Sequence, residues 1–156
     1  MTLNDGIRQS IAESVLCWLA TVDAEGRPNV SPKEVFVADG ENDLLIANIA
    51  SPNSVRNIEV NQAVCVSFIH VFKQKGFKLK GVASVLQPGD PAYTEKHWPL
   101  YKIAGGRFPI HSIIQVRVNS AHRILAPSYR LYPETTETGQ IADAMKTYGV
   151  LPGGET

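Results

Sequence analysis

Alternating apolar and polar positions dominate the chain between residues 15 and 125, and this period of two predicts β-strands. Strands are expected over 15–22, 28–38, 44–49, 64–71 and 77–86, with one or two more over 110–125. The first three of these strands are separated by two turn-forming sequences, Asp23-Ala-Glu-Gly and Asp39-Gly-Glu-Asn. Short strands joined by such tight turns favour an antiparallel arrangement.

Helical spacing interrupts this pattern in a few short segments. Ile7, Ile11 and Val15 recur at helical intervals near the N-terminus, where Asn4 or Asp5 is available as a cap. Further helices are predicted over 52–60, over 92–103 with Asp90 as the cap, and over 141–148. Six or so strands with few helices predict a mostly β domain, built as a small closed or partly closed barrel.

Length and composition fit one globular domain. The 156 residues are 44% hydrophobic and 19% charged, which is enough for a single core. We expect the domain to span 1–126 and a C-terminal arm to span 127–156, packing on the barrel or on a partner subunit. Fifteen basic and fifteen acidic residues cancel, which argues against general nucleic-acid binding.

Several kinds of site are not supported by the sequence. Cys17 and Cys65 lie in apolar runs without a Cys-x-x-Cys spacing, and the four histidines have no metal-ligand spacing, so no metal site is predicted. The motifs Gly-x-Ser-x-Gly, Gly-x-Gly-x-x-Gly and the Walker loop are missing. No apolar run reaches membrane-spanning length and no basic leader precedes one, so we expect a cytoplasmic protein.

The start of the second helix has the chemistry of an anion site. Ser51 can cap the helix and Pro52 can fill its first position, which leaves the N–H groups of Asn53 and Ser54 and the Ser54 hydroxyl pointing outward. Phosphate binds well at such positively polarised ends. The alternative is that Ser51 only caps the helix.

Two further polar groups accompany this helix start. Asn29, Ser31 and Lys33 share one side of a strand, which indicates either a ligand-facing surface or a solvated strand end. Lys78 lies between Gly76 and Gly81, and glycine in a strand often marks the close approach of a ligand or another backbone. The alternative for Lys78 is a lysine on an outer face.

Taken in order, several segments resemble the pyridoxamine 5'-phosphate oxidase-like family of FMN-binding split barrels. The resemblance runs from about residue 15 to residue 118. Each segment alone is weakly specific for the family, but the order and spacing of the segments together are much more specific. The segments are Leu19-Ala-Thr-Val-Asp-Ala-Glu-Gly-Arg-Pro-Asn-Val-Ser-Pro, Ile46-Ala-Asn-Ile, Ser54-Val-Arg-Asn-Ile-Glu-Val-Asn, Cys65-Val-Ser-Phe and Gly76-Phe-Lys-Leu-Lys-Gly-Val-Ala.

The resemblance implies a six-stranded antiparallel split β-barrel that forms a homodimer with FMN at the subunit interface. By position, it implies that the cofactor contacts nine residues of this chain. They are Asn29, Val30, Ser31 and Lys33 on one strand, Ala47 and Asn48 on the next, Asn53 and Ser54 at the helix start, and the basic Lys78. The anion site inferred from helix capping thus coincides with the place where the family holds phosphate.

The chain also departs from the family. Many relatives carry Arg-Lys where this chain has Asn53-Ser54, so phosphate would be held by N–H groups and a hydroxyl. Pyridoxamine phosphate oxidases proper carry glutamine at the position of Gly76 and a C-terminal motif with tryptophan and arginine, whereas this chain has Pro127-Ser-Tyr-Arg-Leu-Tyr-Pro. These differences argue against vitamin B6 oxidation.

The leading hypothesis is therefore an FMN-dependent oxidoreductase acting on an unidentified small molecule or electron donor. In flavin enzymes the cofactor supplies the chemistry, so no catalytic residue is assigned. Trp98 or Tyr101 could border the substrate space or pack in the core. The alternatives are a deazaflavin (F420)-dependent reductase, or a non-catalytic flavin- or haem-binding protein in which His70 or His97 would hold the iron.

Overall fold

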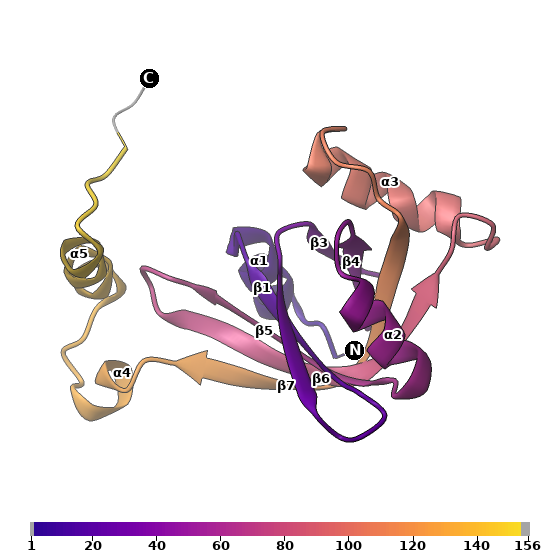
Figure 1. The fold of residues 1–156 in the computed structure, drawn as a ribbon. Helices are drawn as coiled ribbons and strands as arrows, with labels where there is room; N and C mark the ends of the chain where they lie inside the picture. The colour runs from indigo at the N-terminus through magenta and orange to yellow at the C-terminus, as the bar shows by residue number, and fades with distance from the viewer. Residues whose placement is uncertain (1, 154–156) are drawn as a thin grey trace.

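The computed structural model describes residues 2–153 and consists of one strongly curled antiparallel sheet with short helices around it (Figure 1). The elements are α1 (Asp5–Glu13), β1 (Cys17–Val22), β2 (Pro28–Lys33), β3 (Phe36–Asp39), β4 (Asp43–Asn48), α2 (Pro52–Val60), β5 (Ala63–His70), β6 (Lys75–Leu86), α3 (Tyr93–Ala104), β7 (Ser112–Leu125), α4 (Ser128–Leu131) and α5 (Glu137–Tyr148). The predicted class, mostly β with short helices, is confirmed. Positions 1 and 154–156 of the predicted domain and arm lie outside the described residues.

The sheet is rolled so that its two edges are joined by the chain itself. Its strand order is β2-β1-β5-β6-β7-β4-β3, with every neighbouring pair antiparallel. β2 and β3 are therefore the opposite edges, yet only Glu34 and Val35 separate them along the chain. The N–H of Ala47 donates to the carbonyl oxygen of Val35 at 2.9 Å, which holds this link against β4.

The number of strands differs from the prediction because the predicted strand 28–38 is two strands. β2 pairs only with β1, and its ladder ends where Lys33 faces Cys17, the first residue of β1. Beyond Lys33 the chain has no partner on β1, so it bends and starts a new ladder in which Phe36 faces Ile46 on β4. The sheet thus has seven strands where six were expected.

Both faces of β4 are buried, because α3 covers the outside of the barrel wall there. Leu44 and Ile46 face the main core inside the barrel, while Leu45 and Ala47 belong to a second cluster with Leu100 of α3. The main core also takes in the apolar face of α1 and Ile58 of α2. This second core fixes α3 against β4 and so sets one wall of the site described below.

Two of the predicted helix caps can be compared directly with the structure. Asn4 caps α1, since its Oδ1 accepts from the N–H of Ile7 at 3.0 Å. Asp90 does not cap α3; its carboxylate accepts from the N–H of Gln87 at 2.6 Å, and Ala92 precedes the helix without a side-chain cap. α3 ends at Gly105, whose φ of 62° places it in the left-handed region.

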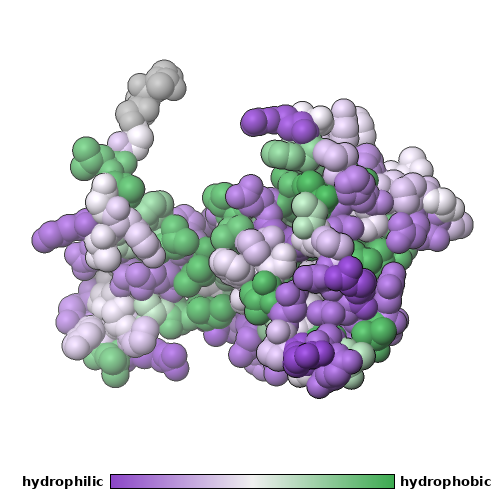
Figure 2. Space-filling model, viewed as in Figure 1, coloured by the Kyte–Doolittle hydropathy of each residue, from purple (hydrophilic) through white to green (hydrophobic). Residues whose placement is uncertain are grey.

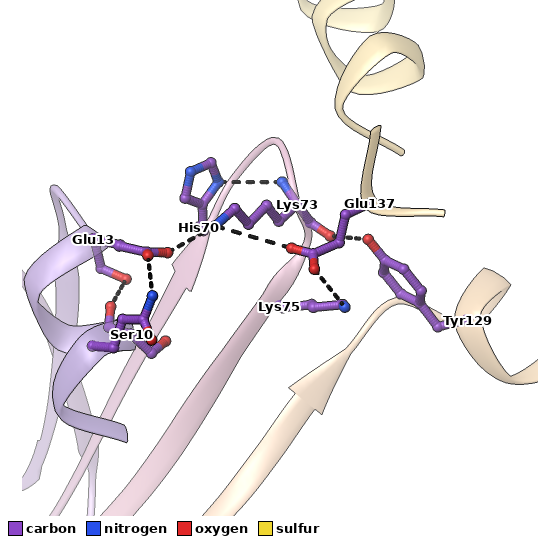
Figure 3. Close-up of polar contacts among 9 residues, drawn as sticks. Ser10, Glu13, His70, Lys73, Lys75, Tyr129 and Glu137 are labelled. Atoms are coloured by element: carbon purple, nitrogen blue, oxygen red, sulfur yellow. Dashed lines mark hydrogen bonds and ion pairs between the residues drawn. The ribbon is translucent and has the colours of Figure 1, made fainter. Parts of the chain in front are cut away.

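After β7 the chain leaves the barrel and forms the arm, drawn in orange to yellow in Figure 1. The arm contacts the tip of the β5–β6 hairpin: the Tyr129 hydroxyl donates to the Lys73 carbonyl at 2.8 Å, and the rings of Phe72 and Tyr148 lie edge to face at 6.1 Å. Figure 3 shows Glu137 of the arm beside Lys73 and Lys75 of this hairpin.

Within residues 2–153, none of the helices has the length and apolar character needed to cross a membrane.

Candidate functional site

A cavity of about 450 Å³ lies where the two edges of the sheet meet. It is lined by Leu16, Ser31, Pro32, Lys33, Glu34, Val35, Ala47, Ile49, Ala50, Ser51 and Phe108. Three of the nine predicted site residues, Ser31, Lys33 and Ala47, are in this lining. Most of the other lining residues are apolar, so the cavity combines apolar walls with one ammonium group.

Lys33 is the central polar group of the cavity. Lys33 is only 6% exposed, and its Nζ donates to the Ser31 hydroxyl at 2.9 Å and to the Ser51 hydroxyl. Among the described residues no carboxylate lies within ion-pair distance of Nζ, although Glu34 lines the same cavity. Burial accordingly lowers the pKa of the Lys33 ammonium. A buried cation with only hydroxyl partners is suited to bind an anion.

The start of α2 lies at the same place, because Ser51 both lines the cavity and precedes the helix. The prediction that Ser51 caps α2 through its side chain is wrong: no side-chain cap is present, and the Ser51 hydroxyl is engaged by Lys33 instead. Pro52 has no N–H to satisfy. The N–H groups of Asn53 and Ser54 are thus left without a capping side chain at the positive end of the helix dipole.

Ser54 carries a hydroxyl that is buried without a partner. The residue is 1% exposed, and Oγ has no hydrogen-bond partner among the described residues. The outward orientation expected for this hydroxyl is therefore wrong. Ser54 and Ile58 are four residues apart on α2 and both are buried, so they share the face that packs on the barrel. The helix start thus contains a buried polar atom without a hydrogen-bond partner among the described residues.

Asn48 positions the helix start. Its Oδ1 accepts from the N–H of Ser51 at 3.1 Å, while its Nδ2 donates to the hydroxyl of Ser112 at 2.9 Å. These two bonds tie the end of β4 to the turn before α2 and to the first residue of β7. Asn48 is therefore next to the cavity and orders Ser51, a contribution that its place in the sequence did not reveal.

Asn29 and Asn53 border a second, polar groove of about 410 Å³ beside the start of α2. Arg27 and Arg56 lie in the same groove, but Arg27 is paired with Asp23 at 2.9 Å and also with Glu25. Arg56 donates to the side chain of Asn53. Arg56 is therefore the one cation of this groove without a carboxylate partner among the described residues, which is little positive charge for a long anionic ligand.

Val30 and Lys78 do not line the cavity. Val30 is 57% exposed and lies on the opposite face of β2 from Asn29 and Ser31, as the period of two predicts. Lys78 is exposed on the outer face of β6, between Ser67 of β5 and His122 of β7 in the sheet. Within one copy of the described chain neither residue is part of the lining of the cavity.

Phe108 also lines the cavity, a residue that was not predicted from the sequence. It belongs to the loop after α3, is 50% exposed, and follows two glycines with positive φ, Gly105 and Gly106. Trp98 and Tyr101 on α3 are 56% and 43% exposed, so core packing is excluded as the role of these two side chains. The signal in the sequence that could have identified this loop is the pair of glycines that follows a helix rich in aromatic residues.

The two histidines considered as haem ligands have other contacts. His70 accepts at Nδ1 from the N–H of Lys73 at 3.2 Å. The ring of His97 is stacked between those of Tyr93 and Tyr101, at centroid distances of 5.3 and 5.7 Å. Neither histidine lines the cavity that contains Lys33.

Comparison with known proteins identifies a family over most of the chain. A family model described as pyridoxamine 5'-phosphate oxidase matches residues 3–125. The search of curated proteins gave no match.

Solved structures share the fold at low sequence identity. An FMN-binding protein from Syntrophomonas wolfei has a TM-score of 0.65 at 14% identity, covering 75% of this chain and 82% of that chain. HutZ, a haem storage protein from Vibrio cholerae, has a TM-score of 0.59 at 26% identity, covering 80% and 95%. An F420 reductase has a TM-score of 0.59 at 22% identity, covering 76% and 98%. The split-barrel fold is confirmed, and the three neighbours bear the names of three different cofactors or ligands.

Proposed function

This chain belongs to the pyridoxamine 5'-phosphate oxidase family, and from that premise we propose that it binds FMN and acts as a flavin-dependent oxidoreductase. Bound FMN would supply hydride or electron transfer, as flavins do. The residues of the chain would bind and orient the cofactor and keep water from its ring. The substrate is a small molecule or electron donor that the chain does not identify.

The observation that carries this proposal is the unpaired ammonium of Lys33 at an uncapped helix start. Lys33, Ser31 and Ser51 converge there with the free N–H groups of Asn53 and Ser54. A phosphate monoester would give Lys33 a counter-ion and the N–H groups an acceptor. The apolar walls of the adjoining cavity suit a flavin ring, and about 450 Å³ falls within the usual size of ligand pockets, roughly 300–1,000 Å³.

We further propose that the active form is a homodimer with the cofactor at the subunit interface. The outer face of the sheet carries exposed apolar side chains, among them Trp18, Val30 and Val82. Val30 and Lys78 would then approach the cofactor bound to the other copy, which explains why neither lines the cavity of its own chain.

A cytoplasmic location is also part of the proposal. Both cysteines are free, and burial raises the pKa of the Cys17 thiol to about 12, which makes that thiol unreactive. Free thiols of this kind are typical of proteins in a reducing compartment.

FMN is favoured over the two alternative cofactors. A deazaflavin with a long anionic tail would need a basic groove, whereas the groove beside α2 has Arg27 neutralised by Asp23 and Glu25. Haem would need an axial ligand in the cavity, and neither His70 nor His97 lines it. The absorption spectrum of the loaded protein separates the three, because haem gives a Soret band and the two flavins absorb at different wavelengths.

Vitamin B6 oxidation is not proposed. At the position of the family's glutamine this chain has Gly76, and a Cβ built there would collide with the backbone of Phe68 and Ile69. The close approach of β5 and β6 therefore leaves no room for a glutamine side chain.

The test is a titration of the purified apoprotein with FMN, followed by the quenching of flavin fluorescence. Lys33→Met should weaken FMN binding by about tenfold to hundredfold, because it removes a charge-assisted bond to phosphate. Lys146→Met, which changes a lysine of α5 outside the site, is the matched control and should leave FMN affinity unchanged, whereas Lys78→Met tests the proposed dimer, in which Lys78 approaches the cofactor and its loss lowers affinity. Equal FMN affinity of the wild type and Lys33→Met would refute the assignment of the phosphate site.

The orphaned hydroxyl allows a second test. Ser54→Ala removes an unsatisfied polar atom, so the apoprotein should keep or gain stability while its FMN affinity falls by about threefold to tenfold. Unchanged FMN affinity in this variant would show that Ser54 takes no part in holding the cofactor.

A further inference from the structure

The end of α3 and the loop after it carry exposed aromatic side chains beside the cavity. We call Trp98, Tyr101 and Phe108 the aromatic ledge; their exposed fractions are 56%, 43% and 50%. Figure 2 shows hydrophobic surface at the end of α3 that faces the arm. Exposed aromatic groups gathered at one place are uncommon on a monomer and mark a binding surface.

The turn after α3 connects Tyr101 to Phe108 and so to the cavity. The rings of Trp98 and Tyr101 are nearly parallel, with an interplanar angle of 13° and centroids 5.8 Å apart. Tyr101 lies against the turn after the helix, since a Cβ on Gly106 would stand 3.0 Å from its hydroxyl oxygen. Two residues further on, Phe108 lines the cavity. A planar molecule lying on these rings would therefore have one end at the cavity mouth.

Two cations accompany the aromatic rings. Lys102 Nζ lies 5.2 Å from the ring centroid of Trp98, and the guanidinium of Arg107 lies 5.9 Å from that of Phe108. Neither cation forms an ion pair with any residue in the range 2–153. On α3 the other lysine, Lys96, is already paired with Asp39 at 2.5 Å. The exposed rings thus lie next to positive charge that no carboxylate in the range 2–153 neutralises.

We propose that the aromatic ledge is the binding surface for the substrate, and that it selects planar aromatic molecules carrying a negative charge. Flat rings would stack on Trp98, Tyr101 and Phe108, and a carboxylate or sulfonate would pair with Lys102 or Arg107. The inference rests on the proposed function for the role of the cavity, whereas binding to the ledge itself requires no cofactor.

The emission of Trp98 gives a direct readout of the ledge. The chain has two tryptophans, so Trp18→Phe leaves Trp98 as the single one. The probes are anthraquinone sulfonate, its neutral hydroxymethyl analogue and the non-planar anion cyclohexane sulfonate, each titrated into the apoprotein. Anthraquinone sulfonate should quench Trp98 saturably and bind about tenfold more tightly than the neutral analogue. Cyclohexane sulfonate should leave the emission unchanged.

Variants separate stacking from charge. The double variant Lys102→Gln, Arg107→Gln should reduce the affinity for anthraquinone sulfonate to that for the neutral analogue, whereas Tyr101→Leu should weaken both quinones. Lys146→Gln, a lysine of α5 outside the ledge, is the matched control and should change neither. FMN added to saturation should leave probe binding in place, since the ledge and the phosphate site are different surfaces.

Several results would overturn the proposal: no saturable quenching, equal affinity for the charged and neutral quinones, or displacement of the probe by FMN. Trp98 emission that depends on protein concentration and not on the probe would also overturn it, because a second copy would then cover the ledge. The FMN titration with Lys33→Met is independent of these measurements, so failure of the ledge and failure of the FMN assignment are distinguishable.

Discussion

Two lysines in this protein have opposite surroundings. Lys33, in the cavity at the joined sheet edges, is buried and has only hydroxyl partners. Lys73, at the tip of the β5–β6 hairpin, lies 2.9 Å from Glu13 of α1 and 4.0 Å from Glu137 of the arm (Figure 3). Burial lowers the pKa of the Lys33 ammonium, whereas the hydrogen bond to Glu13 is the main cause that raises the pKa of Lys73.

The difference separates a structural lysine from a functional one. Lys73 has its counter-ions within the chain and joins three segments, the helix α1, the hairpin and the arm. Lys33 has been desolvated without a counter-ion, an arrangement that costs stability unless a ligand supplies the missing charge. The apoprotein is thus less stable at the cavity than its packing would allow.

Charge reversal gives the largest contrast. Lys33→Glu should weaken FMN binding by about a hundredfold or more, because it adds a repulsive charge as well as removing the attractive one. Lys73→Glu should leave FMN affinity unchanged but place three carboxylates together, releasing the arm to proteolysis. Fluorescence titration and limited proteolysis measure the two effects. The contrast would disappear if both variants lost FMN equally.

Removing the charge of Lys33 should stabilise the apoprotein. Lys33→Met keeps the length of the side chain and removes a desolvated ammonium, so the free energy of unfolding should rise by about 1 kcal/mol. Because the folded pKa of Lys33 lies below its unfolded value, the penalty is complete below the folded pKa and fades as pH rises from there toward the unfolded value of about 10.4. Urea unfolding of both proteins at neutral and alkaline pH measures this. A variant less stable than the wild type at neutral pH would contradict it.

The contact between Glu13 and Lys73 should respond to acid. Lys73 lowers the pKa of Glu13, so this contact stabilises the fold above the unfolded pKa of a glutamate, about 4.3, and the stabilisation is lost as pH falls through the folded pKa. The difference in urea midpoint between the wild type and Glu13→Gln should therefore shrink in acid. A difference that does not change with pH would mean that the charge of the Glu13 carboxylate does not contribute to stability.

The smallest expected effect is that of Tyr129→Phe. The variant loses only the hydrogen bond from the Tyr129 hydroxyl to the Lys73 carbonyl, worth about 0.5–1.5 kcal/mol. Hydrogen exchange of α4 and α5 amides should become faster by a corresponding factor while β1 and β5 amides keep their rates. Faster exchange throughout the sheet would show that the arm supports the whole barrel.

The sequence was sufficient for most elements because their signals are local. Alternation placed most of the strands, and Pro52 and Asn61 bounded α2 as expected. The break at Glu34 was not predictable in this way, since it arises where the ladder to Cys17 ends, and strand pairing depends on residues far apart in the chain. One expected strand therefore became two.

The candidate site shows the same limit. Ser31, Lys33 and Ala47 were found from strand position and family resemblance, and they line one cavity. The engagement of Ser51 by Lys33 joins residues 18 positions apart, so helix-capping rules alone gave the wrong partner. The buried hydroxyl of Ser54 could have been found, because Ile58 one turn later marks that face of α2 as the packed one.

The link of Glu34 and Val35 has a consequence for how such a protein changes over generations. These two residues join the sheet edges and line the cavity, yet they belong to no strand. An exchange of the exposed Glu34 would alter the mouth of the cavity while leaving every strand pairing in place, whereas Val35 is buried in the second core and its carbonyl accepts from Ala47 of β4. Variation in ligand size can therefore accumulate at Glu34 at little risk to folding, which makes this residue the natural first position for a library aimed at new substrates.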